Sequence, residues 1–415
     1  MKLSRYSFGI GDRFTFQGAA QLKAFQLARD QGIDLTPVWN KSQREHNITG
    51  TGPADTRKEA DDAVAALGWK DAYFVDADHI NLSNVEKHIP HSDFFTIDVA
   101  DFIGKGATAD ETERFMQRNI KYKGDLSIPG IRQEFKITDG MLRGIADKFL
   151  FAARKAGEIY RFIRDKKGHD EFVTEVSMDE VDQPQNPVEL FFILGALAGE
   201  GIPLQTVAPK FTGRFNKGVE YQGDLRSFEL EFEHDLLVID HAVREFGLPS
   251  SLKLSVHSGS DKFSIYPVMG GLIRKHDKGI HVKTAGTTWL EEIIGLAEAG
   301  GPALDLAKKI YSLAYERKEE LCGPYATVID INTEELPPPS GVWNWTGEKF
   351  AGTLRHIQDN PLYNSNFRQL LHVGYKVAAE LGDEFRDAVS VHADVIGKNV
   401  CENIFYRHII RLFLS

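Results

Sequence analysis

Short apolar runs alternate with longer segments of helical periodicity along most of the chain. The runs span five or six residues and are rich in β-branched and aromatic side chains, which is typical of buried strands. We predict strands at Leu35–Trp39, Ala72–Asp76, Phe94–Val99, Phe172–Ser177, Leu204–Ala208, Leu252–His257, Gly279–Thr284 and Ala326–Ile331, with a weaker pattern at Tyr6–Ile10.

The segments between these runs carry apolar residues at helical spacing. We predict helices at Ala19–Gln31, Thr56–Leu67, Ala109–Ile120, Asp139–Arg164, Pro187–Gly199, Phe228–Phe246, Trp289–Ala299 and Ala303–Leu321. Regular alternation of strand and helix indicates a parallel sheet whose crossovers are helices. Eight strands in this order favour an α/β fold of the (β/α)8 TIM-like barrel type over an open sheet.

The pattern changes after Asn332. A proline-rich connector, Leu336–Gly341, cannot be a helix or a central strand, and two helical patterns follow it at Asn366–Leu381 and Asp383–Phe413. We therefore predict a catalytic barrel in residues 1–332 and a C-terminal helical subdomain, residues 333–415, packed on it. Because it contains two glycines and a proline, Gln43–Pro53 is predicted to be a mobile loop after the first strand.

Composition narrows the class of protein. The 415 residues are 42% hydrophobic and 26% charged, as in ordinary globular proteins, and the net charge of −11 predicts no general attraction to nucleic acid or anionic membranes. The two cysteines, Cys322 and Cys401, can build neither a disulfide framework nor a four-thiolate zinc site. With no signal segment at the start and no apolar run of about 18 residues, we expect a cytoplasmic protein with a small-molecule partner, and a homo-oligomer stays open.

Polar chemistry interrupts the apolar strands at their carboxyl ends. Four of the predicted strands lead into Asp76–His79, Glu175–Glu180, His257–Ser260 and His281–Thr284. A charged group at such a position carries a burial cost that packing does not explain, and barrel closure brings these ends to one face.

Three histidines lie at or just past the ends of different strands: His79, His257 and His281. Three such ligands would bind a divalent metal and leave positions open for substrate oxygens. The sequence does not distinguish Zn, Mn, Ni and Co. The alternative is three unrelated buried histidines that hydrogen-bond the backbone.

Five carboxylates share this face: Asp76, Asp78, Glu175, Asp179 and Glu180. Each could ligate a metal, orient a histidine or act as an acid or base. Strand alternation points Glu175 to the same side as Asp179, so Glu175 is preferred for the chemistry, with Glu180 as its substitute. For Asp179, a polar loop that leads to the helix at Pro187 is the favoured interpretation.

Cations on the same face could hold an anionic substrate. The candidates are Lys41, Lys210 and Lys283, together with Arg44 and Lys262. Lys210 could alternatively form a Schiff base, as in an aldolase. The turn His257–Lys262 could cradle a carboxylate or phosphate through backbone N–H groups. Motifs for nucleotide hydrolysis, Rossmann hydride transfer, zincin proteolysis and α/β-hydrolase chemistry are missing.

The four strand ends, in order, resemble the tagaturonate/fructuronate epimerase family of bacterial hexuronate catabolism. The resemblance rests on Asp76–His79, Glu175–Glu180, His257–Phe263 and Gly279–Thr284. It implies a metal-dependent isomerase that inverts one carbinol centre of a keto-hexuronate. It also implies His79, His257 and His281 as metal ligands, with Asp78 and Glu175, or Glu180, as an acid/base pair.

In such a substrate the inverted centre lies β to the ketone, so simple enolisation does not acidify its C–H bond. Two routes stay open: direct proton exchange between opposed carboxylates, or retro-aldol cleavage, rotation of the aldehyde fragment and re-addition, which the acidity argument favours. Other classes also stay open. These are a metal-dependent sugar-acid aldolase, a ketose isomerase, and a non-catalytic barrel that binds a sugar acid.

Overall fold

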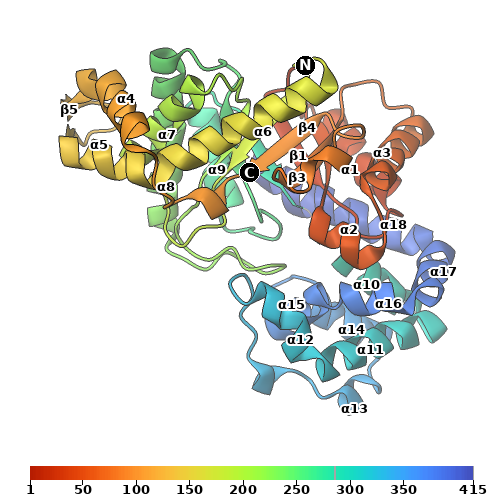
Figure 1. Ribbon diagram of the computed structural model, residues 1–415. Helices are drawn as coiled ribbons and strands as arrows, with labels where there is room; N and C mark the ends of the chain where they lie inside the picture. Colours follow the sequence, from red (N-terminus) through yellow and green to blue (C-terminus); the bar gives the residue numbers. More distant parts are fainter. Residues whose placement is uncertain (285–286, 415) are drawn as a thin grey trace.

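The computed structural model describes residues 1–284 and 287–414 of the chain. Its centre is a closed barrel of parallel strands in the spatial order β1-β10-β9-β8-β7-β4-β3-β2 (Figure 1). The strands are β1 (Tyr6–Ile10), β2 (Thr36–Ser42), β3 (Phe74–Ile80), β4 (Phe94–Asp98), β7 (Val173–Ser177), β8 (Thr206–Ala208), β9 (Lys253–Val256) and β10 (Ile280–Lys283). The predicted (β/α)8 TIM-like fold is confirmed.

Every predicted strand except Ala326–Ile331 overlaps a barrel strand, and the weak pattern Tyr6–Ile10 is β1. This strand closes the barrel by pairing with β2 on one side and β10 on the other. The prediction of a strand at Ala326–Ile331 is wrong. That segment follows a 3-10 turn, and its backbone forms no ladder with any strand of the described residues. Instead the Val328 carbonyl accepts a hydrogen bond from the N–H of Lys217 in a loop, and the Asp330 N–H donates to the Gln369 side chain.

Helices cover the outside of the barrel, and their positions follow the prediction closely. They are α1 (Gly18–Asp30), α3 (Pro53–Leu67), α6 (Phe151–Lys167), α7 (Pro187–Gly199), α8 (Leu225–Phe246) and α9 (Tyr266–Lys275). The start of α7 shows why: the Asn186 side chain accepts hydrogen bonds from two backbone N–H groups, and Pro187 occupies the first turn. Farther out lie α4 (Ala109–Asn119), α5 (Asp139–Ile145) and an unpredicted hairpin of β5 (Gly124–Leu126) and β6 (Phe135–Ile137) (Figure 1).

The prediction of a loop at Gln43–Pro53 is also wrong, because helix α2 (Gln43–Thr49) follows β2 directly. Ser42 and Glu45 form a capping box at its start. Gly50, which suggested a loop, ends the helix in the left-handed conformation, with φ 66°.

A layer of helices faces the carboxyl ends of the strands (Figure 1). It contains α10 (Thr288–Ala299), α11 (Gly301–Glu316), α12 (Lys318–Cys322), α13 (Pro339–Val342), α14 (Gly347–Leu354), α15 (Ser365–Val373), α16 (Tyr375–Leu381) and α17 (Asp383–Val391). The division into residues 1–332 and 333–415 stays a prediction. Helices α10 and α11, which precede residue 332, pack against α14 and α15, which follow it.

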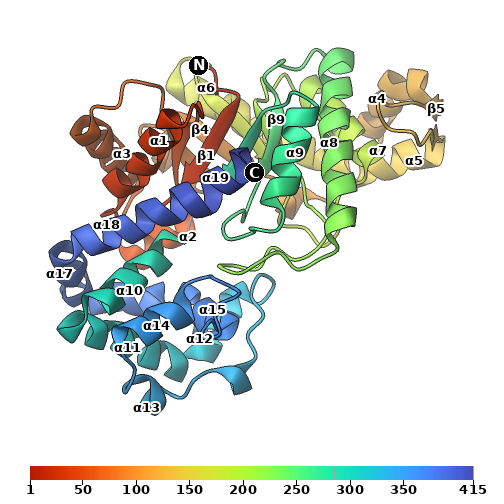
Figure 2. The same ribbon diagram turned by 180° about the vertical axis from the view of Figure 1, so that it is seen from behind.

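The chain then returns to the barrel. Helix α18 (Ala393–Glu402) packs beside α1, a π-helical turn follows, and α19 (Ile410–Phe413) contacts α9 (Figure 2). The rings of Tyr6 and Phe413 lie 4.9 Å apart, so the last helix seals the side of β1. Among the described residues, no helix combines the length and apolar character that a membrane span requires.

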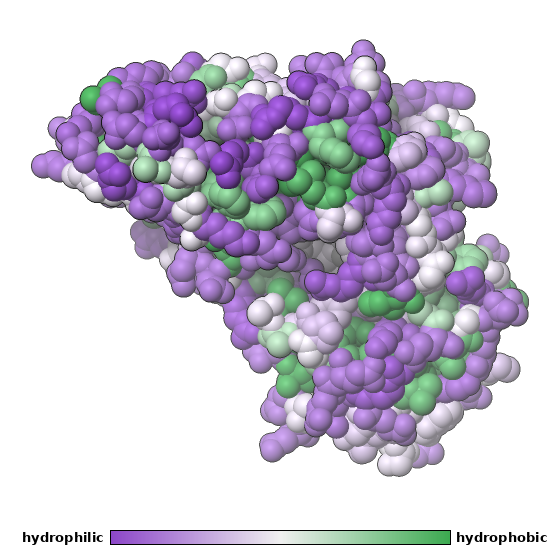
Figure 3. Space-filling model, in the orientation of Figure 1, coloured by the Kyte–Doolittle hydropathy of each residue, from purple (hydrophilic) through white to green (hydrophobic). Residues whose placement is uncertain are grey.

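Buried polar contacts join the strand-end loops to the helical layer. Arg13, after β1, donates to the carbonyl of His372 over 2.8 Å, and Arg368 donates to Asp261, after β9, over 2.9 Å. Figure 3 shows the surface hollowed between the barrel and this layer. The polar strand ends lie on the side of the barrel that faces the layer.

Candidate active site

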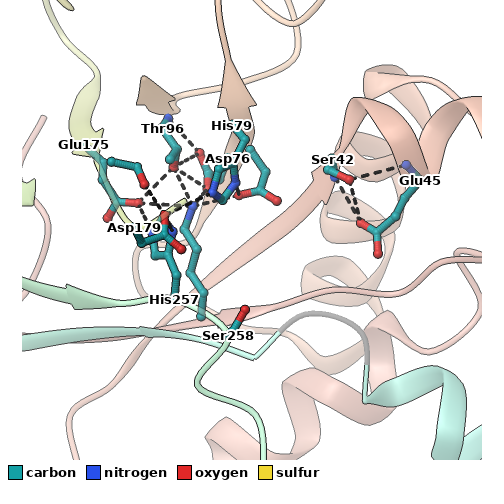
Figure 4. A network of polar contacts seen from close by, with 12 residues as sticks. Ser42, Glu45, Asp76, His79, Thr96, Glu175, Asp179, His257 and Ser258 are labelled. Atoms are coloured by element: carbon teal, nitrogen blue, oxygen red, sulfur yellow. Dashed lines mark hydrogen bonds and ion pairs between the residues drawn. The ribbon is translucent and has the colours of Figure 1, made fainter. Parts of the chain in front are cut away.

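Side chains on or just after five of the barrel strands meet at the carboxyl end of the barrel (Figure 4). Asp76, Asp78 and His79 come from β3, Thr96 from β4, Glu175 from β7 and Lys283 from β10, while Asp179 and His257 follow β7 and β9. The register supports this convergence, since Thr96 pairs with Glu175 across β4 and β7. The carboxyl end of the strands is where barrel enzymes place their chemistry.

The ammonium group of Lys283 is the hub of this cluster. Its Nζ lies 2.7 Å from Asp76 Oδ2, 2.9 Å from Asp78 Oδ1 and 3.2 Å from Glu175 Oε1, and it also donates to Thr96. Burial would lower the pKa of Lys283, but the three carboxylates outweigh burial and hold that pKa well above its ordinary value. Lys283 is therefore charged and fully engaged.

Lys283 in turn controls the carboxylates. Burial would raise the pKa values of Asp78 and Glu175, but the ammonium and the neighbouring histidines hold both well below their usual range. Asp76 differs, because burial dominates and raises its pKa to about 6. Asp78 and Glu175 are thus ionised at neutral pH, and each is available as a base.

The two histidines His79 and His257 both point one nitrogen at Asp179. Nδ1 of His257 lies 3.0 Å from Asp179 Oδ1, and Nε2 of His79 lies 3.6 Å from the same oxygen. The other nitrogen of each ring meets a carboxylate: Nδ1 of His79 is 2.8 Å from Asp78 Oδ1, and Nε2 of His257 is 2.7 Å from Glu175 Oε1. Each ring thus has an outer nitrogen on a carboxylate, Asp78 or Glu175, and an inner nitrogen that points at Asp179.

His79, Asp179 and His257 could hold a metal ion, since one donor atom from each lies within 4.8 Å of the others. Two imidazole nitrogens and a carboxylate oxygen suit a first-row divalent metal. Nε2 of His79 is buried and has no hydrogen-bond partner among the described residues, as a nitrogen reserved for a ligand would be. The carboxylate behind each histidine matches the arrangement that orients metal-binding imidazoles.

His281 lies outside this group of donors. It pairs in register with Ser255, two residues before His257, which places it one layer deeper in the barrel. Its Nδ1 shares a hydrogen bond of 2.9 Å with Ser7, its ring packs on Phe94, and burial lowers its pKa to about 3. Its role as a metal ligand stays a prediction.

The structure separates the two glutamates that the sequence left as alternatives. Glu175 is buried inside the cluster, whereas Glu180 is exposed. Glu175 uses Oε1 for His257, Thr96 and Lys283, while its Oε2 is buried without a hydrogen-bond partner among the described residues. That free oxygen is the one that could take a proton.

The three lysines proposed for the substrate lie in different settings. Lys41 is buried, its ammonium donates to the Arg13 carbonyl, and Lys210 is half-buried beyond β8. Lys283 is bound by three carboxylates. Substrate binding by these residues stays a prediction. Sequence reasoning missed Thr96, whose hydroxyl joins Asp76 to Glu175; its signal is a polar residue inside the apolar run Phe94–Val99.

Comparison with known proteins identifies the family. A family model described as tagaturonate epimerase matches residues 1–397. The chain belongs to the tagaturonate epimerase family. A curated relative from Thermotoga maritima, named tagaturonate/fructuronate epimerase, is 29% identical over 386 residues, which cover 89% of this chain and 73% of the relative.

Solved structures of the family share the fold. The glycerol complex of the fructuronate-tagaturonate epimerase UxaE from Cohnella laeviribosi superposes with a TM-score of 0.83 at 24% identity, and its native form with a TM-score of 0.79 at the same identity. Each match covers 99% of this chain and 82% of the solved one. This member of the tagaturonate epimerase family is therefore an enzyme, a carbohydrate epimerase, and the resemblance seen in the strand-end motifs is confirmed.

Proposed function

We propose that this epimerase interconverts tagaturonate and fructuronate by inverting the carbinol centre β to the ketone. The observation that carries the proposal is the convergence of His79 and His257 on Asp179, with the ionised Asp78 and Glu175 behind them. The name of the Thermotoga maritima relative supports the choice of substrate.

We propose that His79, Asp179 and His257 hold a divalent metal. Such an ion, when bound, supplies Lewis acidity that polarises a substrate carbonyl and stabilises negative charge on oxygen. Asp78 and Glu175 accept the outer N–H of the two imidazoles and so orient the rings. Burial opposes a charge on either ring, but the surrounding carboxylates raise the pKa of both histidines, so each inner nitrogen would give up its proton to coordinate the ion.

Glu175 acts as the base in this proposal. Its Oε1 is held by His257, Thr96 and Lys283, so the carboxylate cannot rotate freely, and Oε2 is buried with no competing donor among the described residues. Its low pKa keeps it unprotonated before substrate binds. Asp78 is the second candidate, since its Oδ1 is held by His79 and Lys283 in the same way.

The position of the inverted centre β to the ketone favours the retro-aldol route over direct proton exchange, because simple enolisation does not acidify its C–H bond. In direct exchange one group must remove that proton while an opposed acid delivers another to the other face. In the retro-aldol route one base suffices. It takes the proton of the β-hydroxyl, the Cα–Cβ bond breaks to give an aldehyde and an enediolate, the aldehyde rotates, the bond re-forms on its other face, and the proton returns.

An isotope experiment separates the two routes. The enzyme is run on tagaturonate in D2O, and NMR measures deuterium at the inverted carbon of the fructuronate formed. We expect that carbon to keep its protium, because the retro-aldol route never breaks its C–H bond. Deuterium at that carbon would establish direct exchange, and free aldehyde in place of an epimer would indicate an aldolase. A protein that turns over neither hexuronate would overturn the proposed function.

A further inference from the structure

A second polar site lies beside the metal-binding group, on the loop between β8 and α8. A short hairpin in this loop, with a bridge between Arg214 and Gln222, carries Lys217 near its tip. The Lys217 ammonium reaches across to Ser258, the residue that follows His257, and its Nζ lies 3.0 Å from the Ser258 hydroxyl. Figure 4 shows Ser258 next to His257 at the edge of the catalytic cluster.

The hairpin tip is held in place by buried groups on three sides. Lys262, which is fully buried, donates to the carbonyls of Asn216 and Val219 over 2.8 and 2.7 Å. The buried Arg368 guanidinium donates to the Gly218 carbonyl, and the Lys217 N–H donates to the Val328 carbonyl. Polar groups that are buried to hold backbone carbonyls make a rigid platform, so the position of Lys217 is built into the fold.

Gly218 shows how closely this platform is fitted. Its φ is 71°, in the left-handed region, and a Cβ at this position would lie 3.0 Å from Cδ2 of His372. A side chain here would push the tip away from the helical layer and carry Lys217 with it.

Lys217 differs from three other cations around the site. Lys283 is neutralised by three carboxylates, Lys262 donates to backbone carbonyls, and Arg13 is paired with Glu45. The Lys217 ammonium instead donates to a hydroxyl, and no carboxylate of the described residues pairs with it. A half-buried ammonium held against a serine hydroxyl offers two donors to an incoming anion.

The catalytic cluster is unfavourable for the carboxylate of a hexuronate. Asp76, Asp78, Glu175 and Asp179 crowd around Lys283 and the two histidines, and their charges exceed those of Lys283 and a divalent ion together. We therefore expect the charged end of the substrate to lie away from the reacting end, next to a cation outside the cluster.

We propose that Lys217 and Ser258 form the subsite that binds the carboxylate of the substrate. The inference rests on the proposed function and deepens it: the pair selects sugar acids over neutral ketohexoses and sets the direction in which the substrate enters the barrel. Lys217 binds the charge, and Ser258 links that end to the loop that carries His257.

Steady-state kinetics of the Lys217→Gln variant test this subsite. The readouts are the KM of tagaturonate and the inhibition constant of the neutral ketohexose that carries a hydroxymethyl group instead of the carboxylate. We expect KM to rise roughly 10- to 100-fold, as for the loss of a charged hydrogen bond, while the inhibition constant changes less than about twofold. The Lys217→Arg variant should restore most of the affinity for the hexuronate.

Lys155→Gln is the matched control, because Lys155 is another half-buried lysine, but it lies on the outer helix α6, where it pairs with Glu158. It should leave both constants near those of the wild type. An unchanged KM in Lys217→Gln, an equal loss for both ligands, or an equal effect at Lys155 would overturn the subsite while the wild-type activity stands. A wild-type enzyme with no turnover of either hexuronate would instead overturn the proposed function, and the subsite with it.

Discussion

Nε2 of His257 lies 2.7 Å from Oε1 of Glu175, so the two oxygens of this carboxylate have different surroundings. Oε1 fixes the orientation of the histidine ring, while Oε2 stays without a hydrogen-bond partner among the described residues. In the proposed mechanism, one side chain therefore supplies the base and also orients a metal-binding histidine. Substitutions at Glu175 should affect proton transfer more than metal binding.

Glu175→Gln keeps a carbonyl oxygen that can accept from His257 but removes the base. We expect kcat to fall roughly 100- to 10,000-fold, the range for loss of a general base. Metal affinity, measured by titration, should fall by no more than about 10- to 100-fold, the range for an outer-shell partner. Glu180→Gln, an exposed residue close in sequence, is the control and should keep wild-type kcat. Full activity in Glu175→Gln would assign the base elsewhere.

Two ligand sets can be told apart without any activity measurement. The geometry favours His79, Asp179 and His257, and the family resemblance implies His79, His257 and His281. Asp179→Asn should weaken binding of Zn²⁺ or Mn²⁺ by on the order of 100-fold or more, beyond the cost of losing an outer-shell group.

His281→Asn is the counterpart of that variant. Because His281 lies one layer deeper and hydrogen-bonds Ser7, its substitution should leave metal affinity within a fewfold of the wild type. Titration calorimetry of both variants decides the matter. A large loss in His281→Asn with none in Asp179→Asn would restore the three-histidine set.

Lys283→Met should destabilise the whole barrel. Removal of the ammonium leaves Asp76 and Glu175 buried without their cation, at a cost of about 3–5 kcal/mol in the free energy of unfolding at pH 7. The deficit should shrink as the pH falls, because burial already raises the pKa of Asp76 to about 6 and loss of the ammonium raises it further, so that a proton can neutralise this carboxylate. Urea unfolding measures both effects.

The matched control is Lys309→Met, which breaks the exposed pair of Lys309 with Glu384 and should cost less than about 1 kcal/mol. Equal losses in the two variants would show that the buried cluster does not depend on Lys283.

Stability should fall as the solution is acidified below pH 6.5. His408 is buried and neutral, with Nδ1 donating to the Asn403 carbonyl and Nε2 accepting from the Asp261 N–H, and burial lowers its pKa to about 4. Between pH 6.5 and pH 4, His408 therefore binds a proton in the unfolded chain but not in the folded one. The stabilisation of the folded state by neutral His408 is present above the ordinary pKa of 6.5 and is lost as the pH falls toward 4.

The shifted pKa of His408 alone should lower the free energy of unfolding by about 2 kcal/mol between pH 7 and pH 5. Urea unfolding of His408→Gln should show a decline that is smaller by that amount. His169→Gln, at an exposed position, should decline as the wild type does. Parallel pH profiles for all three proteins would contradict the assignment.

The barrel could be predicted because its strands are buried on both faces and its helices carry clear start signals, as at Asn186 and Pro187. Two strand assignments were harder. Gly9 weakens the apolar pattern of β1, yet it is needed because a Cβ there would lie 3.1 Å from Cα of Lys283. Ala326–Ile331 has the composition of a strand but no neighbouring edge to pair with, since β1 and β10 already close the barrel.

The sequence predicted which residues lie at the site better than it predicted which of them contact one another. Strand ends identified His79, His257, Asp78 and Glu175, because any parallel barrel gathers them at one face. The depth of a side chain along the barrel axis could not be predicted from the sequence. Residues two apart on a strand share a face but differ in height by roughly 6–7 Å, and this difference separates His281 from Lys283. Asp179 lies in the loop two residues after the end of β7, as expected, but its contact with the two histidines could not be predicted from that position.

The central claim is that a divalent metal held by His79, Asp179 and His257 is needed to interconvert tagaturonate and fructuronate. The direct test is the epimerisation rate of chelator-treated protein, with residual metal measured by elemental analysis, before and after a divalent ion is added back. We expect the epimerisation rate to fall by about 100-fold or more and to recover when the ion is added, because removal of the metal takes away several kcal/mol of transition-state stabilisation. Metal-free protein that epimerises both hexuronates at the full rate would contradict it.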